Sequence, residues 1–371
     1  MASMYRGQMI CTGGKSADLK ESMHTSRTGI MLHLPSGVLH SIFRHVNQQR
    51  KFEVMLTCQS MNRVIRDPLL WDTLSVYEMN SHAVDFVKDV RPTILKLEST
   101  LPEDVIWLLQ ESAVPSLVAT LVHMSIKLGN VHCVAFKFMD ALTKYWALES
   151  LRIVCQSVRM ASTLVFNTET MFPKLRRLVI IDRGMERRNL SVHFEAIAGS
   201  GMPLEHVTLI VHCSDLVSQS NASCWVSSLK SLTYWAQHDA LDDFALRDFC
   251  LDMLNVEIRF DTNTLNLFRQ ISKSRIEHLE ISAYDNVYIG RPLQAEHVFI
   301  QLWSPGFLAD VDFVSVAAPS RLKSLGFQGG AQNSVTFYNV PNLLEFASFA
   351  QTKHLDCSGL NVHLEPPVQQ V

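Results

Sequence analysis

The feature that most constrains the fold is a six-residue pattern, apolar-x-x-apolar-x-apolar, that recurs through most of the chain. Its copies begin at Leu148, Leu175, Leu204, Leu229, Leu251, Ile276, Ala295 and Leu322, with a degraded copy at Leu343 ("LLEFAS") and possible earlier ones at Pro92 ("PTILKL") and Val118 ("VATLVH"). From Leu148 onward, successive starts lie 19 to 29 residues apart. Regular spacing of this size is typical of a stacked solenoid.

Each copy predicts a strand. The apolar-x-apolar end forms a short strand with one face inward, and the first apolar residue packs beneath it. One such unit cannot bury its own apolar face, so successive units must stack to close a core. Between copies, residues 240–254 have helical spacing and residues 215–223 are loop-like. An ordinary α/β domain with leucine-containing strands is the alternative. We therefore predict an α/β solenoid over residues 90–360 and a tail at 361–371.

The repeated block resembles the leucine-rich-repeat family in its irregular form, which implies a horseshoe-like solenoid. That family usually carries an Asn or Cys after the strand, whose side chain bonds backbone groups around the turn. The corresponding positions here are Gln156, Arg183, His212, Gln237 and Tyr284. We therefore expect no Asn ladder and no evenly curved horseshoe.

A different pattern occupies residues 34–76. Pro35 suits the first turn of a helix, where its missing N–H costs nothing. A 3.6-residue apolar period follows at Val38, Leu39, Ile42, Phe43 and Val46, and a second amphipathic run extends from Phe52 to Ile65. Pro68 then ends the helical pattern. Three short helices form too small a core to stand alone, so we expect this segment to complete its apolar surface on a partner.

The same segment resembles an F-box, predicted over residues 33–80, in its "LPxxVLxxIFxxV" opening, Leu56-Thr57-Cys58 and "DPLLW" close. Met61 stands where the family often has Trp. The resemblance implies binding to a Skp-type adaptor, and through it a cullin, with the repeats holding a protein substrate. The residues it implies for adaptor binding are Leu34, Pro35, Val38, Leu39, Ile42, Phe43 and Val46. It also gives Leu56 and Trp71 a role in holding the helices together. The alternative is a helical cap on a leucine-rich-repeat scaffold outside any ligase.

The composition restricts the cellular compartment and the classes of partner that we expect. The net charge of −3 is too small to argue for nucleic acid or an anionic membrane surface as a partner, and we expect neither. The longest apolar runs are strand-length, far short of the ~20 residues that span a bilayer. The eight cysteines form no CxxC pair, which indicates reduced thiols and a cytoplasmic or nuclear protein. Residues 1–30 lack a sustained apolar period, and we predict a disordered leader there.

Candidate substrate contacts are the strand positions between the apolar ones, which should face the concave side of the solenoid. They are Arg152, Arg177, His206, Trp235, His278 and Phe299, with Thr208 and Glu280 beside them. Aromatic and Arg side chains are enriched in protein interfaces. We expect no metal, because His206, His212 and Cys213 lack a fourth ligand at a recognisable spacing. We also expect no cofactor and no catalytic role, because "TGGKS" lacks the first Gly of a phosphate loop and no nucleophile motif is present.

Overall fold

The computed structural model describes residues 34–134, 137–166, 172–184, 189–193, 197, 201–214, 228–236, 250–258, 275–303, 305–318 and 321–367. The chain divides into two compact units, Met1–Ile65 and Arg66–Val371. The leader predicted at residues 1–30 lies outside the described residues. The fold class is mixed α/β, with helices in the first unit and a large parallel sheet in the second.

Three helices make up the described part of the first unit, as the apolar periodicity predicted. They are α1 (Ser36–Arg44), α2 (Gln48–Met55) and α3 (Gln59–Ile65). Asn47 caps α2 by accepting a hydrogen bond from the backbone N–H of Arg50 at 2.9 Å. Helix α3 contacts both α1 and α2. The buried apolar side chains between the helices are Leu39, Phe43, Met55, Met61 and Ile65.

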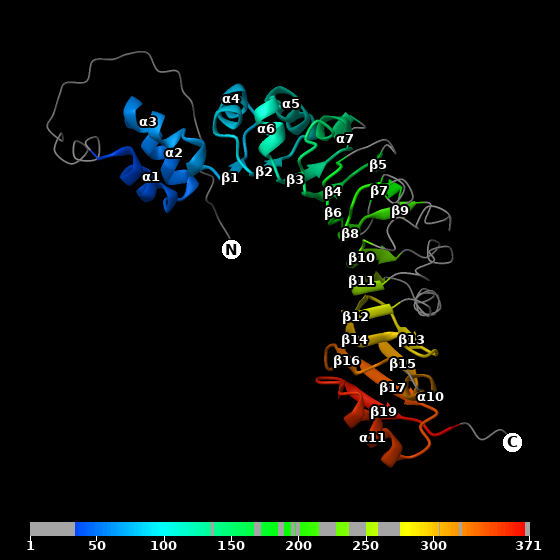
Figure 1. The fold of residues 1–371 in the computed structure, drawn as a ribbon. Coiled ribbons are helices and arrows are strands. Elements are labelled where there is room, and N and C mark those ends of the chain that lie inside the picture. The colour runs from blue at the N-terminus through cyan, green and yellow to red at the C-terminus, as the bar shows by residue number, and fades with distance from the viewer. Residues whose placement is uncertain are drawn as a thin grey trace. The chain divides into compact units, whose positions relative to one another are not determined.

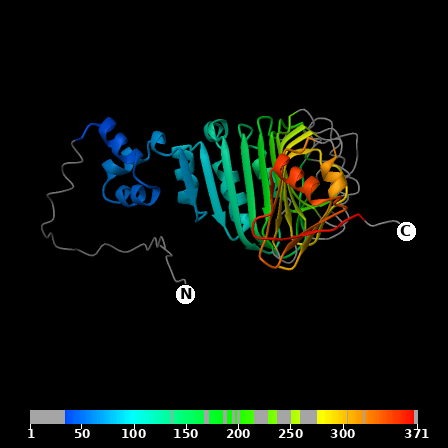
Figure 2. The same ribbon diagram turned by 90° about the horizontal axis from the view of Figure 1, so that it is seen from below.

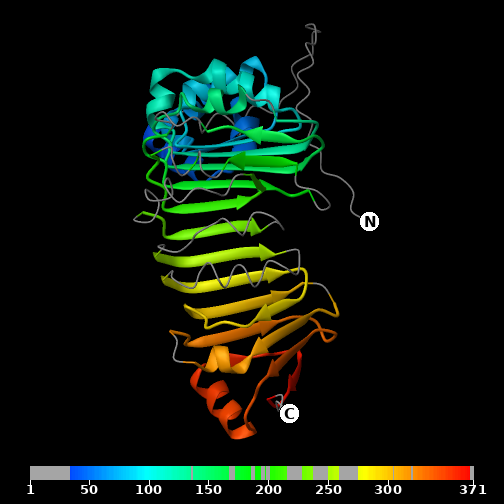
Figure 3. The same cartoon turned by 90° about the vertical axis from the view of Figure 1, so that its right-hand side faces the viewer.

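The second unit is built on one twelve-stranded sheet in which neighbours along the chain are neighbours in space and every pair is parallel. Figures 1 and 3 show the strands following one another in chain order. They are β1 (Thr73–Val76), β2 (Ile94–Ser99), β3 (His123–Val131), β4 (Ser150–Val158), β6 (Arg177–Asp182), β8 (His206–Ile210), β10 (Ser231–Ala236), β11 (Cys250–Ile258), β12 (Arg275–Ala283), β14 (Ala295–Leu302), β16 (Ser324–Gln328) and β18 (Leu355–Asp356).

The register aligns the repeated pattern from strand to strand. Leu151 of β4 pairs with Leu178 of β6, which pairs with Val207 of β8, and all three side chains are buried. The first apolar residue of each of the eight clear copies is buried as well. The side chains between the buried ones point to the opposite face of the sheet. We call this the open face.

Two candidate copies were misplaced. Val118 lies in helix α6 (Pro115–Thr120), and the copy in register begins three residues later, with "LVHMSI" leading into β3. Leu343 begins helix α11 (Leu343–Thr352), and the last strand of the sheet is β18 instead. An additional copy, "WDTLSV", ends in β1, and its residues Trp71, Leu74 and Val76 are buried.

The layer beneath the sheet changes along the chain. Beside the first strands it consists of helices α4 (Ser81–Val90), α5 (Pro102–Ser112), α6 and α7 (Lys137–Leu142), which Figure 2 shows from below. Further on, two short parallel sheets are present. One contains β5 (Ser162–Leu164), β7 (Leu190–His193) and β9 (His212–Ser214), and the other contains β13 (Val287–Ile289), β15 (Leu308–Asp312), β17 (Ser334–Tyr338) and β19 (Asn361–Leu364).

Smaller elements complete the second unit and test two further expectations. A 3-10 turn, η2 (Pro68–Leu70), precedes β1, and helix α10 (Phe313–Ala317) follows β15. The helix predicted at 240–254 is wrong for its described end, because Cys250 begins strand β11. The segment predicted as a tail begins with β19, which pairs with β17.

Candidate functional site

The seven predicted adaptor contacts lie in helix α1 or next to its ends, and they differ in burial. Leu39 and Phe43 are 5% and 2% exposed, so they belong to the core of the helical unit. Val38 and Ile42 lie one helical turn apart and are 44% and 37% exposed. Pro35 is exposed, and Leu34 and Val46 are half-buried. Of the seven, Pro35, Val38 and Ile42 are therefore the exposed residues whose apolar surface is available for a partner.

The structure corrects the roles expected for Leu56 and Trp71. Leu56 is 86% exposed, so it does not hold the helices together. Trp71 is buried in the second unit, where its ring meets that of Phe86 edge-on with centroids 4.9 Å apart. Trp71 therefore packs under the first strand of the sheet, at the position that Leu148 and Leu175 occupy in later copies.

The predicted substrate contacts lie on strands of the large sheet. Arg152 and Arg177 are exposed on β4 and β6, and Arg177 pairs in register with His206 of β8. His278 and Phe299 lie on β12 and β14, two residues out of register with each other. Trp235 is part of β10, but its side chain is outside the described residues.

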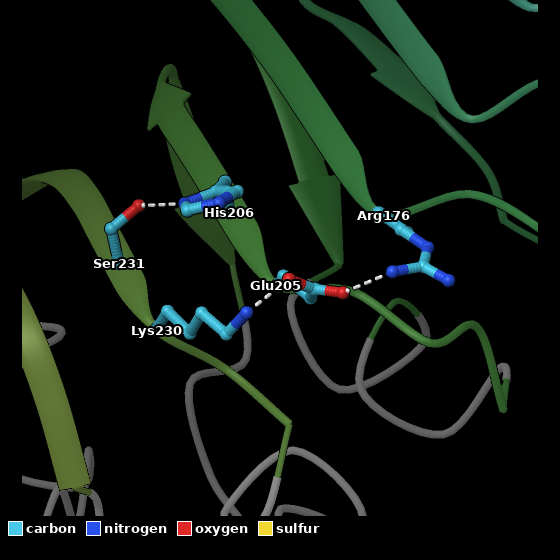
Figure 4. A network of polar contacts seen from close by, with 5 residues as sticks. All are labelled: Arg176, Glu205, His206, Lys230 and Ser231. Atoms are coloured by element: carbon cyan, nitrogen blue, oxygen red, sulfur yellow. Dashed lines mark hydrogen bonds and ion pairs between the residues drawn. The ribbon is translucent and has the colours of Figure 1, made fainter.

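A ladder of charges crosses the sheet at the residue that follows the first apolar position. Glu205 pairs with Arg176 at 2.8 Å and with Lys230 at 2.6 Å, while His206 and Ser231 share a hydrogen bond of 2.8 Å (Figure 4). The hydrogen bond from Lys230 lowers the pKa of Glu205, and Arg176 adds to the effect. Because Arg176 and Lys230 are exposed and Glu205 is only half-buried, their pairing favours one register more than it adds stability.

The ladder borders a hollow of about 580 Å³, whose lining contains more cationic than anionic side chains. Its charged lining is Lys174, Arg176, Lys230, Glu149 and Glu205. On the adjoining open face, Lys96, Arg152 and Arg177 have no ion-pair partner among the residues that the structure describes. This part of the sheet can therefore attract acidic groups.

A second hollow, of about 500 Å³, lies on the open face over β11, β12, β14, β16 and β18. We call it the C-terminal hollow. The rings of His278 and His297 stack there with centroids 4.8 Å apart, and His297 shares a 2.8 Å hydrogen bond with Ser324. Its remaining lining residues are Met253, Asn255, Leu279, Glu280, Val298, Phe299, Gly326, His354 and Asp356.

The sequence pointed to part of this hollow only. His278, Glu280 and Phe299 were among the expected positions, whereas Ser324, Gly326, His354 and Asp356 were missed. Ser324 and Gly326 occupy the same positions in the copy at Leu322, so the signal was present. His354 and Asp356 were hidden because the final copy was placed at Leu343 in place of the strand at Leu355.

Within the described ranges, His, Cys, Asp and Glu side chains nowhere gather in a group of three that could hold a metal ion. His206 is bonded to Ser231, and the side chains of His212 and Cys213 lie outside those ranges. None of the described helices combines the length and the apolar character that a membrane crossing requires.

A comparison with protein families bears on the helical unit. Residues 31–77 match the family model described as F-box-like. The chain carries an F-box-like domain. The match takes in α1–α3 and continues through η2 to β1, so it includes the exposed pair Val38 and Ile42. F-box domains typically bind Skp-type adaptors, and F-box proteins are generally non-catalytic. A search of curated proteins gives no match to the chain.

Proposed function

We propose that this protein is the substrate-recognition subunit of a Skp–cullin–F-box ubiquitin ligase. The observation that carries the proposal is an F-box-like match over helices whose first member leaves Val38 and Ile42 exposed. In such a subunit the F-box-like domain binds the adaptor and the larger unit binds the target protein. Its contribution is proximity and orientation, since other subunits carry the reactive thioester. A location in the cytoplasm or the nucleus accompanies this role.

The proposed adaptor surface is the exposed side of α1 with Pro35 beside it. Burying an apolar side chain of this size stabilises a complex by roughly 1.5–3 kcal/mol. Val38 and Ile42 together therefore account for about 3 kcal/mol or more, a factor of 100 or more in Kd. Leu39 and Phe43 support the surface from within, because they are the buried residues of α1, which packs against α3.

The larger unit we propose as an irregular leucine-rich-repeat solenoid. The sequential parallel sheet and the burial of the repeated apolar positions support this interpretation. Its open face is the proposed substrate surface. Arg152, Arg177 and His206 lie at one part of that face, and His278 and Phe299 at another. Mixed cationic and aromatic side chains of this kind suit protein recognition.

The test is the double variant Val38→Asp with Ile42→Asp, expressed as the full chain. Two charges at a desolvated interface should weaken adaptor binding roughly 100-fold or more, because the apolar burial is lost and the carboxylates lack partners. Co-precipitation should then lose adaptor and cullin, while targets of the larger unit are retained. Adaptor binding that survives in a folded double variant would refute the proposal.

A matched control changes two exposed leucines of the larger unit. Leu343 and Leu344 on α11 are 71% and 84% exposed, and changing both to Asp should leave adaptor binding unchanged. Leu39→Asp serves a different purpose. It places a charge in the helical core and should unfold that unit, which circular dichroism would detect. Loss of binding in that variant therefore carries no information about the contact surface.

One observation favours a second function, a repeat scaffold outside any ligase. The family match extends through β1, the first strand of the large sheet, to residue 77, so the end of the matched segment also forms one edge of that sheet. A pull-down that contains partner proteins but neither adaptor nor cullin would support this alternative.

A further inference from the structure

Neighbouring positions on four strands line much of the C-terminal hollow, and β11 contributes Met253 and Asn255. Glu280, Phe299, Gly326 and Asp356 are paired in register across β12, β14, β16 and β18. Adjacent strands lie about 4.8 Å apart, so these four positions span roughly 14 Å of the open face. His278, His297, Ser324 and His354 form the neighbouring row and line the same hollow.

Gly326 leaves the space that the ring of Phe299 occupies. A Cβ atom at position 326 would lie 2.9 Å from Cδ2 of Phe299, closer than side chains allow. The ring therefore leans across the neighbouring strand in space that only glycine leaves open. Phe299 remains 36% exposed. The result is an aromatic surface inside the hollow, available to a partner.

The charged groups beside this ring are carboxylates. Glu280 has no ion pair or hydrogen bond among the described residues. Asp356 accepts hydrogen bonds from Ser358 through Oδ1, and these lower its pKa, so it stays ionised. Two lysines directly precede lining residues: Lys323 is paired with Glu296 at 2.5 Å, and Lys353 donates to the Leu322 carbonyl at 2.7 Å. The lining thus presents two carboxylates without a lysine or arginine among its members.

We propose that the C-terminal hollow binds an arginine side chain of the protein that this chain recognises. The proposal rests on the substrate-binding role proposed above and adds the chemistry of the substrate. A guanidinium group is planar and always charged, stacks on aromatic faces and donates to carboxylates. Over Phe299 it would lie one strand from Glu280, with Asp356 on the far side. Met253, 40% exposed, supplies an apolar wall for the methylene groups.

The experiment uses the full chain with ¹³C-labelled methionine methyl groups and two blocked amino acids as probes. The probes are N-acetyl-arginine N-methylamide and the citrulline analogue, which has the same shape without the charge. Met253 reports on the hollow, and its resonance is assigned with Met253→Leu. We expect a saturable shift of Met253 with the arginine probe, with Kd in the millimolar range, where ~1 mM corresponds to about −4 kcal/mol. The citrulline probe should bind at least tenfold more weakly.

Two variants and their controls test the residues. Glu280→Gln with Asp356→Asn should weaken arginine binding at least tenfold, because both carboxylate charges are removed. Gly326→Ala should weaken it severalfold, because the new Cβ displaces the Phe299 ring while every charge is kept. The controls are Glu103→Gln, an exposed residue of α5, and Gly330→Ala, where the nearest atom to a Cβ is 3.9 Å away.

Several results would overturn the proposal. Equal binding of the arginine and citrulline probes would show that the hollow does not recognise the positive charge. A larger shift with inorganic phosphate would show that it prefers an anion. Unchanged affinity of the Gly326→Ala protein for the arginine probe would show that the Phe299 ring does not contribute to binding. None of these variants alters α1, so each should still co-precipitate adaptor. Failure here is thereby distinguished from failure of the adaptor test.

Discussion

Asp182 shows how a single side chain can hold a turn of the large unit. It is fully buried at the end of β6. Its Oδ1 accepts from the N–H of Gly184 at 3.0 Å, and its Oδ2 accepts from the N–H groups of Asn189 and Leu190 at 3.0 and 3.1 Å. In the leucine-rich-repeat pattern, the side chain that bonds the turn stands at the next position, which is Arg183 here. The turn is instead held by a carboxylate one position earlier.

Replacing Asp182 with Ala should lower the free energy of unfolding by roughly 2–4 kcal/mol, since three backbone donors lose their acceptor in a buried site. Urea unfolding followed by circular dichroism measures the loss. Asp182→Asn keeps one acceptor oxygen and should lose less. Equal stability of the Ala variant and the parent protein would mean that water replaces the carboxylate at no cost.

Two other buried groups should make the protein sensitive to alkali. Burial raises the pKa of the Cys155 thiol from 9.0 to about 12, with a smaller effect of Asp182, and burial raises the pKa of Tyr145 from 10.0 to about 12. The unfolded chain loses these protons at lower pH than the folded one. Stability from each group is therefore present below its unfolded pKa and falls as the pH rises toward 12, by about 1.4 kcal/mol per pH unit and group.

Urea midpoints measured between pH 8 and 11 test this expectation. Cys155→Ala should show a shallower decline above pH 9 than the parent protein, because one of the two groups is gone. Cys133→Ala is the matched control, since that thiol is exposed and its removal should leave the slope unchanged. Identical slopes in the parent and Cys155→Ala proteins would contradict the assignment.

At the scale of elements, the three helices of the first unit and most strands of the large sheet could be predicted from apolar spacing alone. Periodicity gave α1 but not the division of its residues between core and surface, because Leu39 and Ile42 both belong to a broad apolar face. Which of them is covered depends on where α3 contacts α1. That contact joins residues distant in the chain, and the local pattern does not contain it.

The false copy at Leu343 has a physical explanation. Apolar residues at positions one and four fit a helix as well as a strand with an anchor, so Leu343 and Phe346 satisfy both patterns. The deciding signal lies just before them. Asn342 accepts from the N–H of Glu345 at 2.9 Å, and its side chain also donates to the Glu345 carboxylate at 2.8 Å. Asn followed three residues later by Glu marks a helix start.

At the scale of the larger unit, the sequential sheet implies that neighbouring strands stabilise one another in turn. Each strand contacts the strands before and after it, so stability is approximately a sum over neighbours. The outer layer was not predictable to the same extent. Helices beside the first strands give way to short strands β5, β7 and β9, whose lengths of three or four residues are too short for periodicity to reveal.

Removing residues 320–371 tests this coupling. The truncation deletes β16, β17, β18, β19 and α11, and leaves β14 and β15 as unpaired edges. Apolar side chains now covered, such as Phe313, which contacts Phe346 and Phe349, would meet water. We expect lower solubility and a lower Tm for the whole large unit, because the loss of one end weakens each remaining neighbour in turn.

A shorter truncation provides the control. Ending the chain after Glu365 keeps β19 and the hydrogen bond from the Glu365 N–H to the Phe337 carbonyl at 2.8 Å, so solubility and Tm should match those of the full chain. Scanning calorimetry separates the outcomes. A coupled array gives one transition that shifts as a whole in the longer truncation. A second transition that keeps its original Tm would mean that the first strands of the sheet fold independently of the last.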